Sequence, residues 1–349
     1  MAALKEVRFG TVGTNFIVDE FLRVASSLPD FRLTAVYSRT AERAAAFVAK
    51  HTTAPPAQPL VATFTSLEAL AACTDVDAVY IASPTSEHAR QAMLLLRAGK
   101  HVLCEKPACS HAEELAEVLA VAREAGRAFM EAMRPLKTPQ FAAVRAHLVA
   151  FAEQGSPVRH FAGSFCQLSS RWPAYLRGER PNAFRPDLSN GALMDLGCYA
   201  IYSAVALLGV PDGVSYTPLM LPTGVDGAGT VVMTYADTAI ATLVISKMSH
   251  GWNYSELQTD AGTVRIGNLG DYDEVQLHTK GSPPKLLGPH GLAGHSNMVY
   301  EVAGFVAMVQ AGRLEDDILT WDLALAVARV MDRARDSAGI VFPADKNRV

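Results

Sequence analysis

The strongest constraint on the fold is an alternation of strand-like and helix-like segments over the first part of the chain. Short apolar runs rich in β-formers alternate with segments whose apolar residues recur at helical spacing. Strands are predicted at residues 7–11, 32–37, 62–64, 78–82, 101–104 and 128–131. The run at 78–82 is apolar on both faces, as a buried parallel strand is. This order predicts an α/β fold with a doubly wound parallel sheet.

The pattern changes after about Pro135. Residues 171–190 are rich in Arg, Pro and Asn and are interpreted as a loop over a site. Later strands follow one another without helices, which predicts an open, mainly antiparallel sheet in an α+β domain. We therefore predict two domains, residues 1–134 and 135–349. The elements predicted in the second are helices at 140–151, 191–208, 298–310 and 320–338, and strands at 160–166, 229–235, 239–248, 255–259, 263–266, 274–279 and 339–343.

The composition is that of a soluble globular protein. The 349 residues carry a formal net charge of −4, half of them are apolar and 19% are charged. Five cysteines without a C-x-x-C pair favour reduced thiols and a cytoplasmic protein. Basic and acidic residues are interspersed, so no nucleic-acid partner is expected. Charges at Lys5, Glu6 and Arg8 argue against a signal peptide, and apolar runs such as 239–245 are too short to span a membrane.

A glycine-containing turn follows the first predicted strand. It stands where the N–H groups of a following helix would meet a dinucleotide pyrophosphate, as in a Rossmann domain. If Gly13 is the first glycine of a G-x-G-x-x-G fingerprint, Asn15 and Val18 replace the other two. Asparagine can adopt the left-handed conformation that such a turn requires. The segment also fits an ordinary strand-to-helix turn. The cofactor-binding candidates here are Gly13, Thr14, Asn15, Phe16 and Ile17.

The end of the second predicted strand indicates which dinucleotide is preferred. NAD enzymes usually carry an acidic residue there, which binds the ribose 2′-hydroxyl. This chain has Ser38 and Arg39, followed by Arg43 in the next helix. A hydroxyl and guanidinium groups donate to a 2′-phosphate, whereas a carboxylate would repel it. We therefore predict NADP(H) as the preferred cofactor, with NAD(H) possible. Arg39 and Arg43 could also be solvated residues at the start of a helix.

Three further segments carry more specific patterns. In chain order they are Ala82-Ser83-Pro84-Thr85-Ser-Glu-His88, Glu105-Lys106-Pro107 and Gly191-Ala-Leu-Met-Asp195-Leu-Gly197-Cys-Tyr199. Together, and in this order, they resemble the Gfo/Idh/MocA family of nicotinamide-dependent oxidoreductases, and the resemblance covers nearly the whole chain. A tyrosine at position 199 is typical of the branch that includes glucose-fructose oxidoreductases, NADP-dependent xylose dehydrogenases and dimeric dihydrodiol dehydrogenases.

The resemblance implies that the cofactor lies across the carboxyl ends of the first domain's strands and that substrate lies between the domains. It also implies that the open face of the second sheet serves in subunit association. Taken singly, His88 could be only a helix-start residue and Glu105 only a strand-end carboxylate. The cofactor residues that it adds are Ser83, Pro84, Thr85, His88, Glu105, Lys106 and Pro107.

Lys106 and Tyr199 match the residues that the family uses for proton transfer. Oxidation of a carbinol requires a base for the hydroxyl proton while a hydride leaves the carbon. Free tyrosine titrates near pKa 10, and a nearby ammonium favours its ionised form. We assign Tyr199 as the proton acceptor or donor, and Lys106 as the group that orients the hydroxyl and lowers the Tyr199 pKa; the roles could be exchanged. Asp195 lies one helical turn before Tyr199 and could bind a second hydroxyl. Pro107 could form a cis bond that fixes the Lys106 amine.

Two arginines are weaker substrate candidates. Arg134 follows the last predicted strand of the first domain, and Arg185 lies in the 171–190 loop. Salt bridges are an equally good interpretation of both. The histidines are scattered and no His/Cys cluster has ligand spacing, so no metal site is expected.

The sequence therefore predicts an NADP(H)-preferring oxidoreductase acting on a hydroxyl/carbonyl pair of a sugar, polyol or vicinal diol. The alternatives are an epimerase or redox-assisted lyase that recycles a tightly bound NAD(P), and a non-catalytic nucleotide-sensing regulator. The resemblance implies a homodimer or homotetramer, and the alternating strands of the second domain offer apolar faces for such an association. These faces include Val231, Met233, Leu243 and Ile245.

Overall fold

A computed structural model of the chain describes residues 6–51, 61–289 and 296–348. The chain divides into two compact units. The first unit comprises Met1–Cys109, Glu113–Ala132 and Met298–Trp321, and the second comprises Ser110–Ala112, Met133–Asn297 and Asp322–Val349. The domain boundary between residues 134 and 135 stays a prediction.

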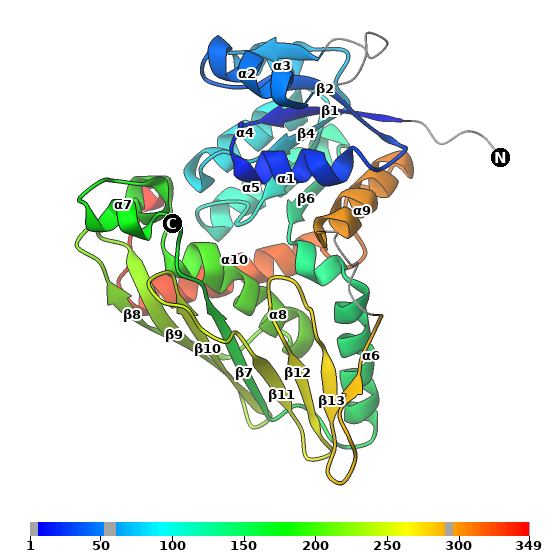
Figure 1. The fold of residues 1–349 in the computed structure, drawn as a ribbon, viewed down its shortest axis with the longest axis vertical. Helices are drawn as coiled ribbons and strands as arrows, with labels where there is room; N and C mark the ends of the chain where they lie inside the picture. The colour runs from blue at the N-terminus through cyan, green and yellow to red at the C-terminus, as the bar shows by residue number, and fades with distance from the viewer. Residues whose placement is uncertain (1–5, 52–60, 290–295, 349) are drawn as a thin grey trace, which may run out of the picture. The chain divides into compact units, whose positions relative to one another are not determined.

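The first unit is built on a six-stranded sheet in which every neighbouring pair is parallel. Its strand order is β3-β2-β1-β4-β5-β6 (Figure 1). The prediction of a doubly wound parallel sheet is confirmed. The strands are β1 (Val7–Val12), β2 (Phe31–Tyr37), β3 (Ala62–Phe64), β4 (Ala78–Ile81), β5 (His101–Glu105) and β6 (Phe129–Ala132).

Helices that connect these strands cover the sheet, and a helix from near the end of the chain joins them. Phe305 of that helix lies 5.9 Å from the ring of Phe9 in β1, which also packs on Phe21 and Phe31. The core of the first unit therefore needs a segment distant in sequence. The helices are α1 (Phe16–Ala25), α2 (Ala41–His51), α3 (Leu67–Ala72), α4 (Thr85–Arg97), α5 (Ala112–Ala125) and α9 (Met298–Gln310).

The second unit contains an eight-stranded sheet of order β14-β13-β12-β11-β7-β10-β9-β8. Only β7 and β10 pair in parallel; the other neighbours are antiparallel, as predicted. β8 was not predicted, and it lies at the edge of the sheet, where Pro218 is tolerated. The strands are β7 (His160–Cys166), β8 (Gly213–Met220), β9 (Asp226–Tyr235), β10 (Ala239–Ser246), β11 (Ser255–Gln258), β12 (Thr263–Ile266), β13 (Gln276–His278) and β14 (Lys285–Leu286).

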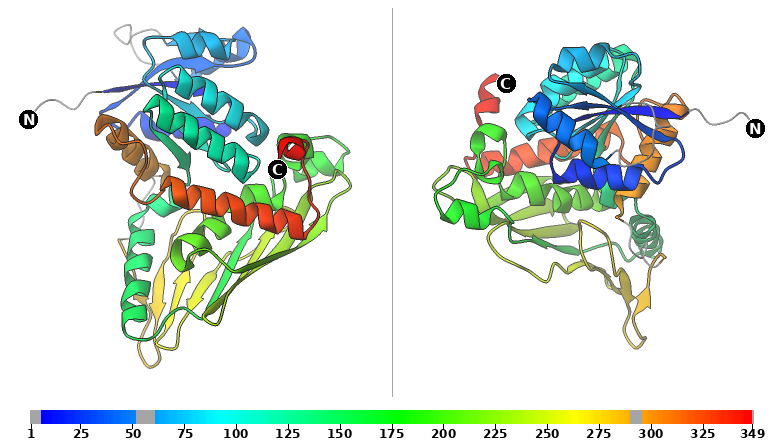
Figure 2. Two further views of the ribbon diagram at one scale, coloured as in Figure 1. Left: turned by 180° about the vertical axis from the view of Figure 1, so that it is seen from behind. Right: turned by 45° about the horizontal axis from the view of Figure 1, so that its top comes forward.

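Helices pack on one face of this sheet (Figure 2). Val231, Met233, Leu243 and Ile245 face them and are buried within the chain. The expectation that these four side chains form a subunit interface is therefore wrong. The opposite face of β10 exposes Ile240 and Val244 instead. The helical elements are η1 (Arg134–Lys137), α6 (Pro139–Glu153), α7 (Trp172–Leu176), η2 (Asn182–Phe184), η3 (Pro186–Leu188), the π-helix η4 (Leu193–Gly197), α8 (Cys198–Leu208), α10 (Trp321–Ser337) and η5 (Pro343–Asn347).

One stretch of the described chain, Pro186–Leu208, is long and apolar enough to cross a membrane, with a mean hydropathy of 1.5. The protein itself buries 78% of the residues in this window. That degree of burial is usual for the core helix of a globular domain. The expected absence of a membrane-spanning segment stays a prediction.

The predicted strand at 339–343 is wrong, because this segment leads into the short helix η5. Ile340 and Phe342 are buried, which explains their apolar character. Pro343 begins the helix, and the Asp345 carboxylate accepts a hydrogen bond from the Phe342 N–H at 2.6 Å. A capping interaction therefore replaces a strand ladder.

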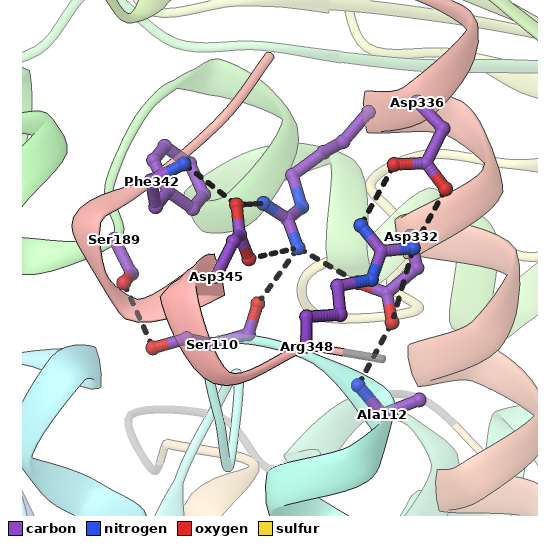
Figure 3. Close-up of polar contacts among 9 residues, drawn as sticks. Ser110, Ala112, Ser189, Asp332, Asp336, Phe342, Asp345 and Arg348 are labelled. Carbon is purple, nitrogen blue, oxygen red and sulfur yellow. Dashed lines mark hydrogen bonds and ion pairs between the residues drawn. The ribbon is translucent and has the colours of Figure 1, made fainter. Parts of the chain in front are cut away.

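The buried Arg335 ties η5 to α10, and Figure 3 labels its carboxylate partners, Asp332 and Asp345. The Arg335 side chain is 1% exposed and pairs with Asp345 at 2.7 Å and Asp332 at 2.8 Å. It also donates to the Ser110 carbonyl at 3.3 Å, and Asp332 accepts from the Ala112 N–H at 2.8 Å. Burial by itself raises the pKa of Asp345, but the hydrogen bonds from Arg335 and the Phe342 N–H, together with the charge of Arg335, outweigh it, so the pKa is lowered.

We predict that Asp345→Ala lowers the free energy of unfolding by about 3 kcal/mol, because a buried guanidinium loses one of two carboxylates. The matched control is Asp317→Ala, which removes an exposed partner of Arg313 and should cost less than about 1 kcal/mol. Urea unfolding at pH 7 measures both. Because the folded-state pKa of Asp345 is lowered, its contribution should fade as the pH falls below about 4. Equal effects of the two substitutions at pH 7 would contradict the prediction.

Candidate active site

The turn after β1 requires glycine at position 13. Gly13 has φ +111°, and a Cβ on it would lie 2.9 Å from the Ala82 carbonyl oxygen. Its N–H donates to the Tyr37 carbonyl at 3.2 Å. The ends of three neighbouring strands, β2, β1 and β4, therefore meet at this turn. The strand order reverses direction between β1 and β4, which is where dinucleotides bind in such sheets.

Asn15 begins α1 as its N-cap, with extended backbone rather than the left-handed conformation expected from the sequence. Its Oδ1 accepts from the N–H groups of Ile17 at 3.1 Å and Val18 at 3.3 Å. Its Nδ2 donates to the Ala82 carbonyl at 2.8 Å. Asparagine thus replaces the second glycine because its side chain organises the turn that glycine would otherwise form.

The other candidates at this turn lie beside it. Thr14 and Ile17 are half-buried, whereas the Phe16 side chain is 74% exposed at the start of α1. Val18, which stands at the position of the third glycine, is fully buried and packs in the core beneath the turn.

Of the three residues predicted to select the cofactor, Ser38 and Arg39 follow β2 directly and Arg43 lies in α2. Ser38 is buried and its N–H donates to the Phe64 carbonyl of β3 at 3.0 Å. Arg39 and Arg43 are exposed, and Thr40 caps α2 by accepting from the Arg43 N–H. The Tyr37 carbonyl at the end of β2 accepts the hydrogen bond from the Gly13 N–H. The residues that follow Tyr37 therefore start beside the glycine turn.

His88 joins the segments that follow β4 and β5. It is buried in α4, with Nε2 at 2.8 Å from the Ser83 carbonyl and Nδ1 at 3.0 Å from the Pro107 carbonyl. Burial lowers its pKa, so the ring is neutral at pH 7 and donates to one of the two oxygens. Pro84 precedes α4 and Thr85 is its first residue. His88, in the first turn of α4, therefore also holds the Lys106-Pro107 segment in place.

Lys106 follows β5, and the Lys106-Pro107 bond is cis, as the sequence suggested. The Glu105 carboxylate accepts from the Tyr80 hydroxyl at 2.5 Å and from the Lys106 N–H at 3.2 Å. Tyr80 in turn stacks on Phe21 at 3.9 Å. Sequence reasoning missed Tyr80, although a tyrosine inside an apolar buried strand signals that its hydroxyl has a partner.

In the second unit a buried aspartate holds the start of the helix that carries Asp195 and Tyr199. Asp226 accepts from the Leu193 N–H and from the Tyr216 hydroxyl, each at 2.6 Å. Gly191 has φ +149°, and a Cβ there would collide with the Asp226 carboxylate. Burial raises the pKa of Asp226. Asp226 was also missed from the sequence.

Asp195 lies in the π-helix η4, and Tyr199 is the second residue of α8. The two residues are four apart along the chain, but η4 has the wider turns of a π-helix, so the shared face expected from an α-helix stays a prediction. The Tyr199 ring packs edge-on against Phe165 of β7 at 5.1 Å. Asp195 pairs with Lys247 at 2.9 Å. Lys247 follows β10 and was not recognised from the sequence, although a lysine ending a long apolar run is unusual.

Comparison with known proteins identifies the family. The model described as the oxidoreductase family with an NAD-binding Rossmann fold matches residues 7–133, and the GFO/IDH/MocA C-terminal domain matches residues 156–265. A scyllo-inositol 2-dehydrogenase (NADP(+)) from Bacillus subtilis is 41% identical over 97% of this chain and 99% of its own. The chain belongs to the Gfo/Idh/MocA oxidoreductase family.

More distant relatives match over nearly the same length. A trans-1,2-dihydrobenzene-1,2-diol dehydrogenase from Mus musculus is 28% identical over 97% of this chain and 99% of its own. The solved structure of a 3-ketoreductase from Actinomadura kijaniata with NADP and TDP-benzene superimposes with a TM-score of 0.81. It is 24% identical over 95% of this chain and 98% of its own, and it shows the shared fold.

The two arginine candidates form ion pairs in this Gfo/Idh/MocA protein. Arg134 in η1 pairs with Asp271 at 3.4 Å, and half-buried Arg185 pairs with Asp187. Their substrate roles stay predictions, as do those of the other predicted site residues. Over residues 6–51, 61–289 and 296–348, no group of three or more His, Cys, Asp or Glu side chains could hold a metal ion.

We predict that Gly13→Ala weakens NADPH binding roughly tenfold or more, because the turn must move away from Ala82 and cease to present its N–H groups. Gly126→Ala is the matched control: Gly126 has φ +59° with nothing within 4 Å of a Cβ. It should cost about 1 kcal/mol of stability and leave binding intact. Fluorescence titration and thermal unfolding separate the two effects, and unchanged NADPH affinity in Gly13→Ala would contradict the prediction.

Proposed function

We propose that this protein is an NADP(H)-preferring oxidoreductase that transfers a hydride between the nicotinamide and a hydroxyl/carbonyl group of a sugar, polyol or vicinal diol. The observation that carries the cofactor preference is the Ser38-Arg39 pair beside the Gly13 turn, with Arg43 one turn further on. It replaces the carboxylate that would bind an NAD ribose.

The first unit fits such a dinucleotide. Gly13 leaves room where any Cβ would collide with backbone, so a pyrophosphate could approach closely. α1 begins at Phe16 and offers its N-terminus at the same edge of the sheet. Arg39 and Arg43 are exposed and can pair with a 2′-phosphate. When bound, the nicotinamide supplies the hydride acceptor or donor.

We assign the proton chemistry to three side chains. Tyr199 accepts or donates the hydroxyl proton, and Lys106 orients the hydroxyl and favours the ionised tyrosine. Asp195 binds a second hydroxyl of the substrate. The Tyr80-Glu105 pair and His88 support this assignment, because they fix the backbone on both sides of Lys106.

The substrate class is inferred from the relatives. Scyllo-inositol and a dihydrobenzene diol, the substrates in their names, both present a hydroxyl next to another oxygen-bearing carbon. We also infer a cytoplasmic homodimer or homotetramer. Ile240 and Val244 on the open face of β10, with Trp252 85% exposed nearby in sequence, support self-association.

We predict that NADPH binds at least tenfold more tightly than NADH, because guanidinium–phosphate hydrogen bonds contribute about 1.5–3 kcal/mol. Arg39→Asp should remove most of this difference by weakening NADPH alone. Arg97→Asp, an equal change of charge at an exposed position of α4, should leave the preference unchanged. Nicotinamide fluorescence titrations measure both cofactors. Equal affinities in the wild type would overturn the preference, and a cofactor that co-purifies without exchanging would favour internal recycling.

We predict that Lys106→Ala and Tyr199→Phe lower kcat by about 10²–10⁴-fold on a sugar, polyol or diol while NADPH affinity stays close to wild type. The reason is that each removes a group needed for proton transfer and leaves the Gly13 turn untouched. Steady-state kinetics with NADP⁺ over a panel of these substrates provide the test. Wild-type rates in either variant would contradict the mechanism.

A further inference from the structure

Lys247 occupies a buried position where an apolar side chain would be expected. It directly follows β10, and its side chain is only 2% exposed. Its ammonium contacts three oxygens: Asp195 Oδ2 at 2.9 Å, the Ala183 carbonyl at 3.0 Å and Asn190 Oδ1 at 3.3 Å. An ammonium has three N–H donors, so this set can satisfy all of them.

From this arrangement we propose that Lys247 is a positioning residue that holds the Asp195 carboxylate for a second substrate hydroxyl and ties it to the 171–190 loop, so that the site selects vicinal diols. The inference rests on the proposed function, which assigns Asp195 to the substrate.

The exposure of the two partners is unequal. Lys247 is sealed from solvent, whereas the Asp195 side chain is 38% exposed. A substrate can therefore reach the carboxylate but not the ammonium. An ionised carboxylate only accepts hydrogen bonds, so it favours a ligand that offers a hydroxyl donor. The buried ammonium pairs with Oδ2 at 2.9 Å and so fixes the direction of the carboxylate oxygens.

The same ammonium also contacts the loop. Ala183 lies in η2, and Asn190 precedes the Gly191 turn that leads to η4. Beneath them, Nζ lies 5.2 Å from the ring of Phe184, which packs with Trp172 and Tyr175. The Lys247 ammonium thus contacts both the 171–190 loop and the Asp195 carboxylate.

A merely structural ion pair would not explain this choice of residue. Burying an ammonium carries a large desolvation penalty before its partners compensate, and a protein with an apolar residue of similar volume there is often as stable. The neighbouring inward residues of β10, Leu243 and Ile245, are apolar. A charge at position 247 is therefore best explained by its effect on Asp195.

The test uses Lys247→Met and Lys247→Arg in the full-length protein, with exposed Lys280→Met as the control. For a vicinal diol with saturating NADP⁺, we expect Lys247→Met to raise KM about tenfold or more with a smaller effect on kcat. Lys247→Arg should recover most of the loss because it keeps the charge. For a mono-alcohol the KM should not change, so discrimination between the two substrates falls.

A double variant separates positioning from stability. Lys247→Met should add almost no further loss of KM to Asp195→Asn, because the residue acts through Asp195. This double variant buries no unpaired charge, so it stays informative if Lys247→Met alone fails to fold. An independent KM loss in the Asp195→Asn background, or an unchanged diol KM in Lys247→Met, would overturn the proposal.

A substrate-free measurement distinguishes this inference from the proposed function. Hydrogen exchange over residues 182–190 should speed up in Lys247→Met and remain near wild type in Lys280→Met. If the wild type oxidises none of the sugars, polyols and diols, the proposed function fails while this measurement still tests the tether. Unchanged exchange in Lys247→Met would exclude the proposed role of Lys247 in holding the 171–190 loop.

Discussion

The cofactor edge of the first unit depends on the direct pairing of β1 with β4. This pairing brings the Ala82 carbonyl against the Gly13 turn, where it receives the Asn15 side chain and leaves no room for a Cβ. The same turn is bonded to the end of β2, so the predicted 2′-phosphate donors lie next to the predicted pyrophosphate site. The close approach of the Gly13 turn to Ala82 therefore aligns the ends of β2, β1 and β4. The same turn sets the direction of α1, which starts at Phe16.

The second unit positions its chemistry by burying charge. Asp226 is almost fully buried and holds the start of η4 through the Leu193 N–H, while Lys247 contacts Asp195 from the end of β10. Asp226 is the first residue of β9 and Lys247 directly follows β10, and strands are more rigid than the loop that these groups organise. The exposed carboxylate of Asp195 is thus supported by a cation at the end of one strand, and its helix by an anion at the start of another.

The alternation of apolar runs was enough to predict the parallel sheet, and short local motifs were enough to find Gly13 and Lys106. Hydrophobic periodicity failed at two places. Pro218 argued against a strand where the edge strand β8 lies, and the buried Ile340 and Phe342 gave a strand-like pattern just before η5. Tyr80, Asp226 and Lys247 escaped notice for another reason. Their partners lie 25, 33 and more than 50 residues away in sequence, and no local pattern encodes such pairs.

The position of α9 has a consequence for how the chain acquires its structure during synthesis. Phe305 completes the aromatic cluster around Phe9, yet residues 133–297 of the other unit are translated between β6 and α9. The nascent parallel sheet therefore leaves an apolar surface uncovered until α9 has left the ribosome. A chaperone that shields this surface, or slow translation before residue 298, would act at the stage when the first unit is most prone to aggregate.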